Sequence, residues 1–186
     1  MKTLVFIIIG LLFQYTSAQN YIPIIENNTD LNYICKLHGQ TRTLTLTTKI
    51  VSDTLVFKLE TRGVKSSIVQ LPEAIESGTE LSYNQGEYSD VLILKPSETF
   101  FLISKSAYKN LVEKNQFVYN NTTYVVDNTK EEKVIINGQE LATWHVVAEI
   151  DETEIWILKN PNFPLLCKMT KNPLGINFTL TEIVNK

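Results

Sequence analysis

In the stretch TRTLTLTTKIV, residues 41–51, side chains suited to a solvent-exposed face alternate strictly with side chains suited to a buried face. Thr43, Thr45, Thr47 and Lys49 share the open face, and the other face carries Leu44, Leu46, Thr48 and Ile50. A period of two that is rich in threonine is typical of a strand with one buried side. Residues 31–37 and 55–59 repeat the alternation on either side, so this part of the chain predicts successive strands separated by turns.

The later part of the chain predicts hairpins around a single helix. Asn137-Gly138 between two apolar runs is the strongest short hairpin signal, and Asn120-Asn121 also tolerates the left-handed turn conformation. A short helical turn is predicted at residues 72–76. The helix is predicted over residues 104–114, with Ser104 as N-cap and with one apolar side made of Ala107, Tyr108, Leu111 and Val112. The whole pattern predicts a mainly β fold, an antiparallel curved sheet or half-barrel of about ten strands with one central helix.

The first residues have the form of a secretory signal peptide. Lys2 gives a positive start, residues 4–13 are almost continuously apolar, and small residues precede a cleavage point after Ala18. The apolar run is shorter than the roughly 20 residues that span a bilayer. We therefore predict a signal peptide over residues 1–18 and a single β-rich domain over residues 19–186, exported to a periplasmic or extracellular location without a transmembrane span in the mature chain.

The charge of the chain excludes one class of partner. The net charge is −3 over 186 residues, and the only arginines are Arg42 and Arg62. A mildly acidic chain does not attract nucleic acid or an anionic membrane surface. We therefore predict no nucleic-acid partner.

The two cysteines allow two interpretations. Cys35 and Cys167 could form a disulfide in an oxidising compartment, and the closed loop would make that link stabilising by about 4–5 kcal/mol. Alternatively, each is a buried thiol that behaves as a small apolar side chain. A single pair at this spacing is not a metal or redox motif.

The polar residues of the sequence show no catalytic or cofactor signature. The only imidazoles are His38 and His145, and neither has the neighbouring ligands of a zinc site. Ser66 and Ser104 lack the flanking pattern of a serine nucleophile. The sequence therefore predicts no catalytic residue, no metal ligand and no cofactor.

The C-terminal part of the chain carries a resemblance to known proteins. A strand with Trp144 is followed by Glu154-Ile155-Trp156-Ile157, by Phe163-Pro164-Leu165-Leu166 and by a final alternating strand. This order resembles the ending of uncharacterised secreted envelope proteins of the Bacteroidetes type and, more distantly, that of LolA/LolB-like periplasmic carriers. The resemblance to the carriers implies a curved antiparallel sheet that wraps a helix and encloses an apolar cavity for acyl chains. The arginine that helps lipoprotein carriers stay closed has no counterpart, because Arg42 and Arg62 lie early and at strand ends.

Three functional hypotheses follow from these patterns. The first is an exported, non-enzymatic domain that binds an apolar small molecule, lipid or acyl chain, with Tyr108, Leu111, Trp144 and Trp156 as ligand-binding residues. It predicts an apolar cavity of about 300 Å³ or more. The second is a structural or adaptor protein of the cell envelope with a protein partner, which predicts an exposed apolar patch. The third is a secreted hydrolase whose converging polar residues lie in a cleft.

Overall fold

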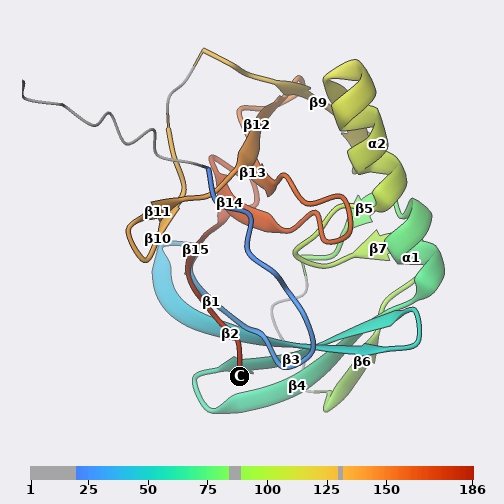
Figure 1. The fold of residues 1–186 in the computed structure, drawn as a ribbon, viewed down its shortest axis with the longest axis vertical. Helices are drawn as coiled ribbons and strands as arrows, with labels where there is room; N and C mark the ends of the chain where they lie inside the picture. The colour runs from blue at the N-terminus through green and yellow to red at the C-terminus, as the bar shows by residue number, and fades with distance from the viewer. Residues whose placement is uncertain (1–19, 84–88, 130–131) are drawn as a thin grey trace, which may run out of the picture.

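The fold is dominated by one large curved sheet (Figure 1). A computed structural model describes residues 20–83, 89–129 and 132–186, so the predicted signal peptide at residues 1–18 lies outside the described residues. The sheet has 11 strands and is not closed into a barrel. Its strands in spatial order are β6 (Val91–Ile93), β4 (Val64–Gln70), β3 (Thr54–Thr61), β2 (Gln40–Val51), β1 (Asp30–Leu37), β15 (Ile176–Val184), β14 (Leu166–Thr170), β13 (Glu154–Leu158), β12 (Thr143–Ala148), β9 (Thr122–Val126) and β8 (Gln116–Tyr119).

The predicted curved β fold is confirmed, with two differences. The sheet is mixed, because β6 pairs parallel with β4 while the other pairs are antiparallel. The described residues also contain two helices, because the predicted turn at residues 72–76 is a helix, α1 (Pro72–Ser77). Pro72 stands in its first turn, where a missing backbone N–H costs nothing.

Tight turns connect the first four strands. At the β3–β4 turn both Arg62 and Gly63 have positive φ, 49° and 77°, which is the combination that a two-residue hairpin requires. The Asn137-Gly138 turn has the same signature, with φ of 52° and 76°. It joins β10 (Ile135–Ile136) to β11 (Gln139–Glu140), as the dipeptide predicted.

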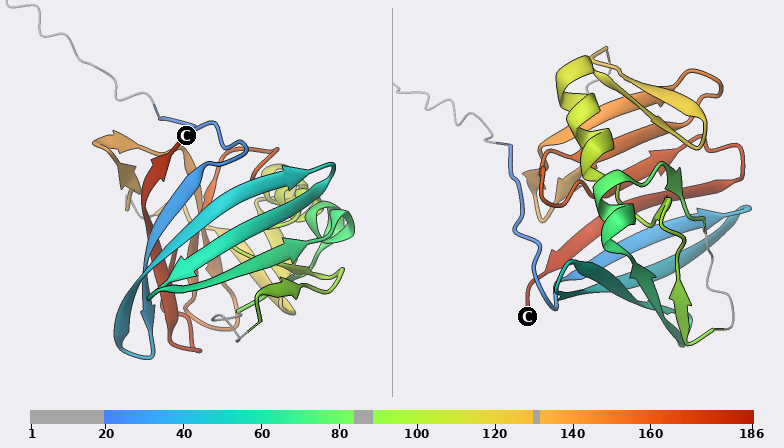
Figure 2. Two further views of the ribbon diagram at one scale, coloured as in Figure 1. Left: turned by 90° about the horizontal axis from the view of Figure 1, so that it is seen from below. Right: turned by 90° about the vertical axis from the view of Figure 1, so that its right-hand side faces the viewer.

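Both helices lie across the concave side of the sheet (Figure 2). In α2 (Lys105–Lys114) the Ser104 side chain accepts a hydrogen bond from the backbone N–H of Ala107, and Asn115 closes the helix in the left-handed conformation. The predicted N-cap is therefore confirmed. A small parallel pair, β5 (Glu80–Leu81) with β7 (Glu98–Thr99), connects the helices to the rest of the concave side.

The two cysteines lie on strands that are not neighbours. Cys35 is in β1 and Cys167 in β14, with β15 between them. Since adjacent strands are about 4.8 Å apart, the two Cα atoms are separated by about 10 Å or more, beyond the reach of a disulfide. The structure has both as free, buried thiols, so the disulfide alternative would require the central strands to move.

Candidate functional site

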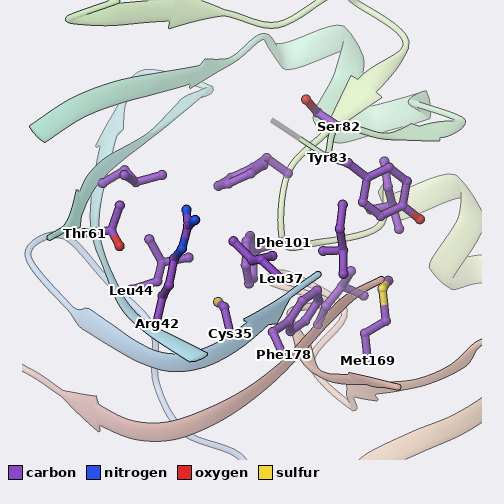
Figure 3. Close-up of a pocket in the computed structure, with 15 residues that line it drawn as sticks. Cys35, Leu37, Arg42, Leu44, Thr61, Ser82, Tyr83, Phe101, Met169 and Phe178 are labelled. Atoms are coloured by element: carbon purple, nitrogen blue, oxygen red, sulfur yellow. The ribbon is translucent and has the colours of Figure 1, made fainter. Parts of the chain in front are cut away.

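An apolar pocket opens at one end of the concave side of the sheet (Figure 3). Its cavity volume is about 70 Å³. Strands β1, β2, β3, β14 and β15 supply its walls, together with residues 81–83 and 100–101 of the connecting segments. The aliphatic part of the lining consists of Leu37, Leu44, Leu59, Leu81, Leu166 and Ile176.

The strand register explains why these side chains meet. Arg42 lies opposite Cys35, Cys35 lies opposite Phe178, and Phe178 lies opposite Met169. Residues that are directly opposite in a sheet point to the same face, so the four form one row across β2, β1, β15 and β14. At about 4.8 Å per strand the row is about 14 Å long. All four side chains line the pocket.

Phe101 fills the middle of this pocket. Its ring centroid lies 4.5 Å from that of Phe178, 4.6 Å from that of Tyr33 and 4.8 Å from that of Phe100. Its backbone φ is +56°, a conformation that bulky side chains rarely adopt and that costs on the order of 1–3 kcal/mol. The aromatic contacts therefore stabilise Phe101 in a backbone conformation that is intrinsically unfavourable.

Arg42 brings a charge to the apolar wall. Its Nη2 donates a hydrogen bond to Oε1 of Gln40 at 3.0 Å, whereas its Nε is buried and meets no hydrogen-bond acceptor among the described residues. Figure 3 shows the side chain extending into the pocket beside Thr61. No Asp or Glu belongs to the described residues that line the pocket. Next to Arg42, burial raises the pKa of the Cys35 thiol to about 11, so this thiol is neutral at physiological pH.

The four residues predicted to bind the ligand are not part of this pocket. Tyr108 and Leu111 are buried on the inner side of α2. Trp144 and Trp156 instead line a second, mainly polar pocket of about 340 Å³ together with His145. The structure thus separates the helix residues from the tryptophans, and a ligand-binding role for the four stays a prediction.

His145 forms the centre of a polar cluster beside this second pocket. Its ring stacks on that of Trp156 with centroids 4.3 Å apart. Its Nε2 lies 3.2 Å from Oε2 of the buried Glu154, and its Nδ1 lies 3.2 Å from the carbonyl oxygen of Asp127. Lys171 adds an ion pair to Glu154 at 2.7 Å. Both ring nitrogens therefore face protein oxygens in this arrangement.

The described residues contain neither a cluster of metal ligands nor a helix that could span a membrane. Nowhere in the described ranges do three or more His, Cys, Asp or Glu side chains gather as metal ligands would. Within the same ranges, no helix has the length and apolar character needed to cross a bilayer.

Sequence reasoning missed Arg42 and Phe101, although a signal for Arg42 was present. In the alternating stretch at residues 41–51, position 42 belongs to the same face as Leu44 and Leu46. An arginine on the apolar face of a strand is a departure from the pattern and marks a position of interest. Phe101 had no comparable signal in the sequence, because nothing in the dipeptide Phe100-Phe101 indicates that the second residue has a positive φ.

Comparisons with known proteins give one distant structural likeness. No protein-family model matches the chain, and no curated protein matches it. The crystal structure of MucB matches with a TM-score of 0.43 and 12% sequence identity over 86% of this chain. The chain spans about half of that structure, 54% of its length.

Proposed function

We propose that this chain is a non-enzymatic domain that binds an apolar small molecule or an acyl chain in the pocket lined by Phe101 and Phe178. The observation that carries the proposal is the position of the pocket: five strands and two connecting segments direct aliphatic and aromatic side chains into one opening on the concave side. Concave apolar sites with a few polar groups are the usual form of small-molecule sites. A bound ligand would replace water on these side chains and would gain the free energy of that burial.

The size of the pocket makes Phe101 part of the proposal. A cavity of about 70 Å³ is smaller than the roughly 300 Å³ at which ligand pockets begin. Rotation of the Phe101 ring away from Phe178 and Tyr33 would join its volume to the cavity. Because the backbone of Phe101 is already in an unfavourable conformation, relaxation of its φ would offset part of the cost of losing the ring contacts.

Native mass spectrometry of the delipidated chain with dodecanol and dodecanoate would test this function. We expect a stoichiometric complex with at least one of the two, and a more abundant complex for Phe101→Ala because the truncation enlarges the cavity. Val118→Ala, on the exposed side of β8, is the matched control and should bind like the unmodified chain. Absence of any complex with both the unmodified chain and Phe101→Ala would refute the proposal.

Export is part of the same proposal. The signal peptide predicted over residues 1–18 would deliver the domain to the periplasm or to the exterior, where free lipids and acyl chains are encountered at membrane surfaces. Expression of the full chain in a secreting host, followed by mass measurement, should give a product that begins at Gln19. A cytoplasmic product that retains Met1 would contradict this part.

A protein-adaptor function is the second candidate, and the outer edge of the sheet favours it. β6 pairs with β4 on one side only, and within the described residues its other side has no partner strand. Val91 and Ile93 on this edge are 54% and 64% exposed. An open edge with apolar side chains can accept an extended peptide as an additional strand. Ile93→Lys should abolish such pairing and leave dodecanoate binding unchanged.

A further inference from the structure

We infer that the ligand of the apolar pocket is an anionic amphiphile whose carboxylate pairs with Arg42 while its tail lies along the row of Cys35, Phe178 and Met169. This inference rests on the proposed function and adds to it the chemical class of the ligand. It concerns one end of the pocket, where the only charged side chain among the described lining residues is Arg42.

The position of Arg42 is imposed by the sheet. Its direct partner across the strands is Cys35, and the inner face of β2 continues with the buried Leu44 and Leu46. A one-residue change of register would turn all of these side chains outward, so the pairing that buries the leucines also directs Arg42 inward. The guanidinium is therefore held at the end of the apolar row by the same hydrogen bonds that build the wall.

The charge of Arg42 is not compensated within the described part of the chain. Arg42 is half-buried, and a charged group that is partly removed from water without a counter-ion loses part of its hydration energy. The Gln40 amide that accepts from Nη2 is neutral, and the buried Nε has no acceptor among the described residues. Such a site costs stability in the empty protein, and an incoming anion would remove that cost.

The geometry of the unpaired donor fits a carboxylate. Nε and Nη2 lie on the same edge of the guanidinium, and the two parallel N–H groups of one edge match the two oxygens of a carboxylate. Gln40 engages only Nη2. A carboxylate on this edge would therefore satisfy the buried Nε and supply the missing negative charge at the same time.

The row beyond Arg42 suits an unbranched apolar tail. From Arg42 to Met169 it extends about 14 Å across four strands, and Phe101 covers its middle. The Cys35 thiol next to the guanidinium is neutral, because burial raises its pKa to about 11, so it does not compete as an anion. The charged end and the apolar row together describe a molecule with one acidic head and one extended tail.

Calorimetry with three probes that share one tail would test the head group. The probes are dodecanoate, dodecanol and dodecyltrimethylammonium, each titrated below its micellar concentration into the unmodified chain, Arg42→Gln, Arg42→Lys and Arg62→Gln. Arg62 lies in the β3–β4 turn outside the pocket and is the matched control. We expect dodecanoate to bind tenfold or more tightly than dodecanol and the cation to bind weakest, because one charge-assisted contact is worth about that ratio.

The variants separate the head group from the pocket itself. In Arg42→Gln the preference for dodecanoate over dodecanol should disappear, while the affinity for dodecanol stays within twofold of the unmodified chain. Arg42→Lys should retain part of this preference, and Arg62→Gln should retain all of it. Equal affinities of dodecanoate and dodecanol for the unmodified chain, or a preference that survives Arg42→Gln, would overturn the inference and leave the apolar function intact. Binding of none of the probes, also by Phe101→Ala, would reject both. The thermal midpoint of Arg42→Gln should not fall, since the change removes an uncompensated charge.

Discussion

β2 and β13 belong to the same sheet, yet only β2 keeps the alternation of a one-sided strand. In the middle of β2 buried residues alternate with half-buried ones, whereas all five residues of β13 are buried. The difference lies on the outer face of the sheet, at Trp156 of β13. The His145 ring stacks on the indole ring of Trp156, and the ammonium group of Lys168 lies over that indole ring. The indole Nε1 of Trp156 also donates a hydrogen bond to the backbone carbonyl of Glu132. We call β12–β14 the covered half of the sheet and β1–β4 the open half.

The comparison indicates where this fold can change shape. The covered half has packed side chains on both faces, so that movement of its strands would disrupt two layers of contacts. The open half has one packed face, and it supplies β1, β2 and β3 to the wall of the apolar pocket, whereas the covered half supplies only β14. A ligand that needs space beyond about 70 Å³ would therefore be accommodated at the open half. The following predictions test this division, from the largest effect to the smallest.

Trp156→Ala tests whether the outer face of the covered half is true core. Trp156 is 1% exposed, and truncation of a buried tryptophan costs about 3–5 kcal/mol of unfolding free energy. Thr43→Ala, on the outer and exposed face of β2, should change the same quantity by less than about 0.5 kcal/mol. Urea unfolding followed by circular dichroism measures both. Similar losses for the two variants would mean that the halves do not differ.

Glu154→Gln tests the charge network that closes the covered half. The buried carboxylate loses its charge-assisted contacts with His145 and Lys171, and we expect a loss of about 1–3 kcal/mol in the free energy of unfolding. The control in the open half is Glu60→Gln, whose ion pair with Lys65 is solvent-exposed and should be worth less than about 0.5 kcal/mol. An equal response of the two pairs would argue against a buried network.

Ser104→Ala tests how firmly α2 is fixed over the concave side. Ser104 Oγ donates to the carbonyl oxygen of Gly78 at 2.7 Å and accepts from the Ala107 N–H, and loss of a buried cap of this kind costs about 1–2 kcal/mol. The measurement is again the urea midpoint, together with hydrogen exchange of the α2 amides. Unchanged exchange in the first turn of α2 would show that the cap does not anchor the helix.

The dependence of unfolding free energy on alkaline pH tests whether the Cys35 thiol of the open half is buried. Burial raises the pKa of this thiol from 9.0 to about 11, so the folded state holds the proton more tightly than the unfolded state. The associated stability is fully present below pH 9 and is lost as pH rises through about 11. Between pH 8 and pH 10 the unmodified chain should lose about 1 kcal/mol more stability than Cys35→Ala. Parallel pH profiles of the two proteins would contradict burial of the thiol.

Local patterns in the sequence predicted the elements that depend on local physics. The alternation at residues 41–51, the Ser104 cap and the Asn137-Gly138 turn each act within a few residues. The structure confirms all three, except that Ile50 at the end of the alternation is exposed. The parallel β4–β6 pair was not predictable, because no local signal specifies which distant strand completes an edge. The outward but buried position of Trp156 was missed for the same reason: its cover comes from another segment, at Glu132.

The candidate site was less predictable than the fold. It is assembled from five strands and two connecting segments, and only the register between distant strands brings Arg42, Cys35, Phe178 and Met169 into one row. The sequence predicted aromatic residues as cavity residues because aromatic side chains commonly line ligand pockets. Their distribution between α2 and the second pocket depends on tertiary packing that no local pattern in the sequence reveals.

The pairing of β1 with β15 has a consequence for how the chain reaches this fold. The hydrogen-bonded side chains of Asn32 and Glu182 are 150 residues apart in sequence, so the middle of the sheet is its most non-local contact. During folding β1 can form a ladder with β2 early, but its other edge stays open until β15 pairs with it. Contacts between residues so far apart in sequence slow folding. A strand edge that is still unpaired can form hydrogen bonds with another chain. The folding chain therefore passes through an interval of high aggregation risk, in which a holding chaperone would have its greatest effect on yield.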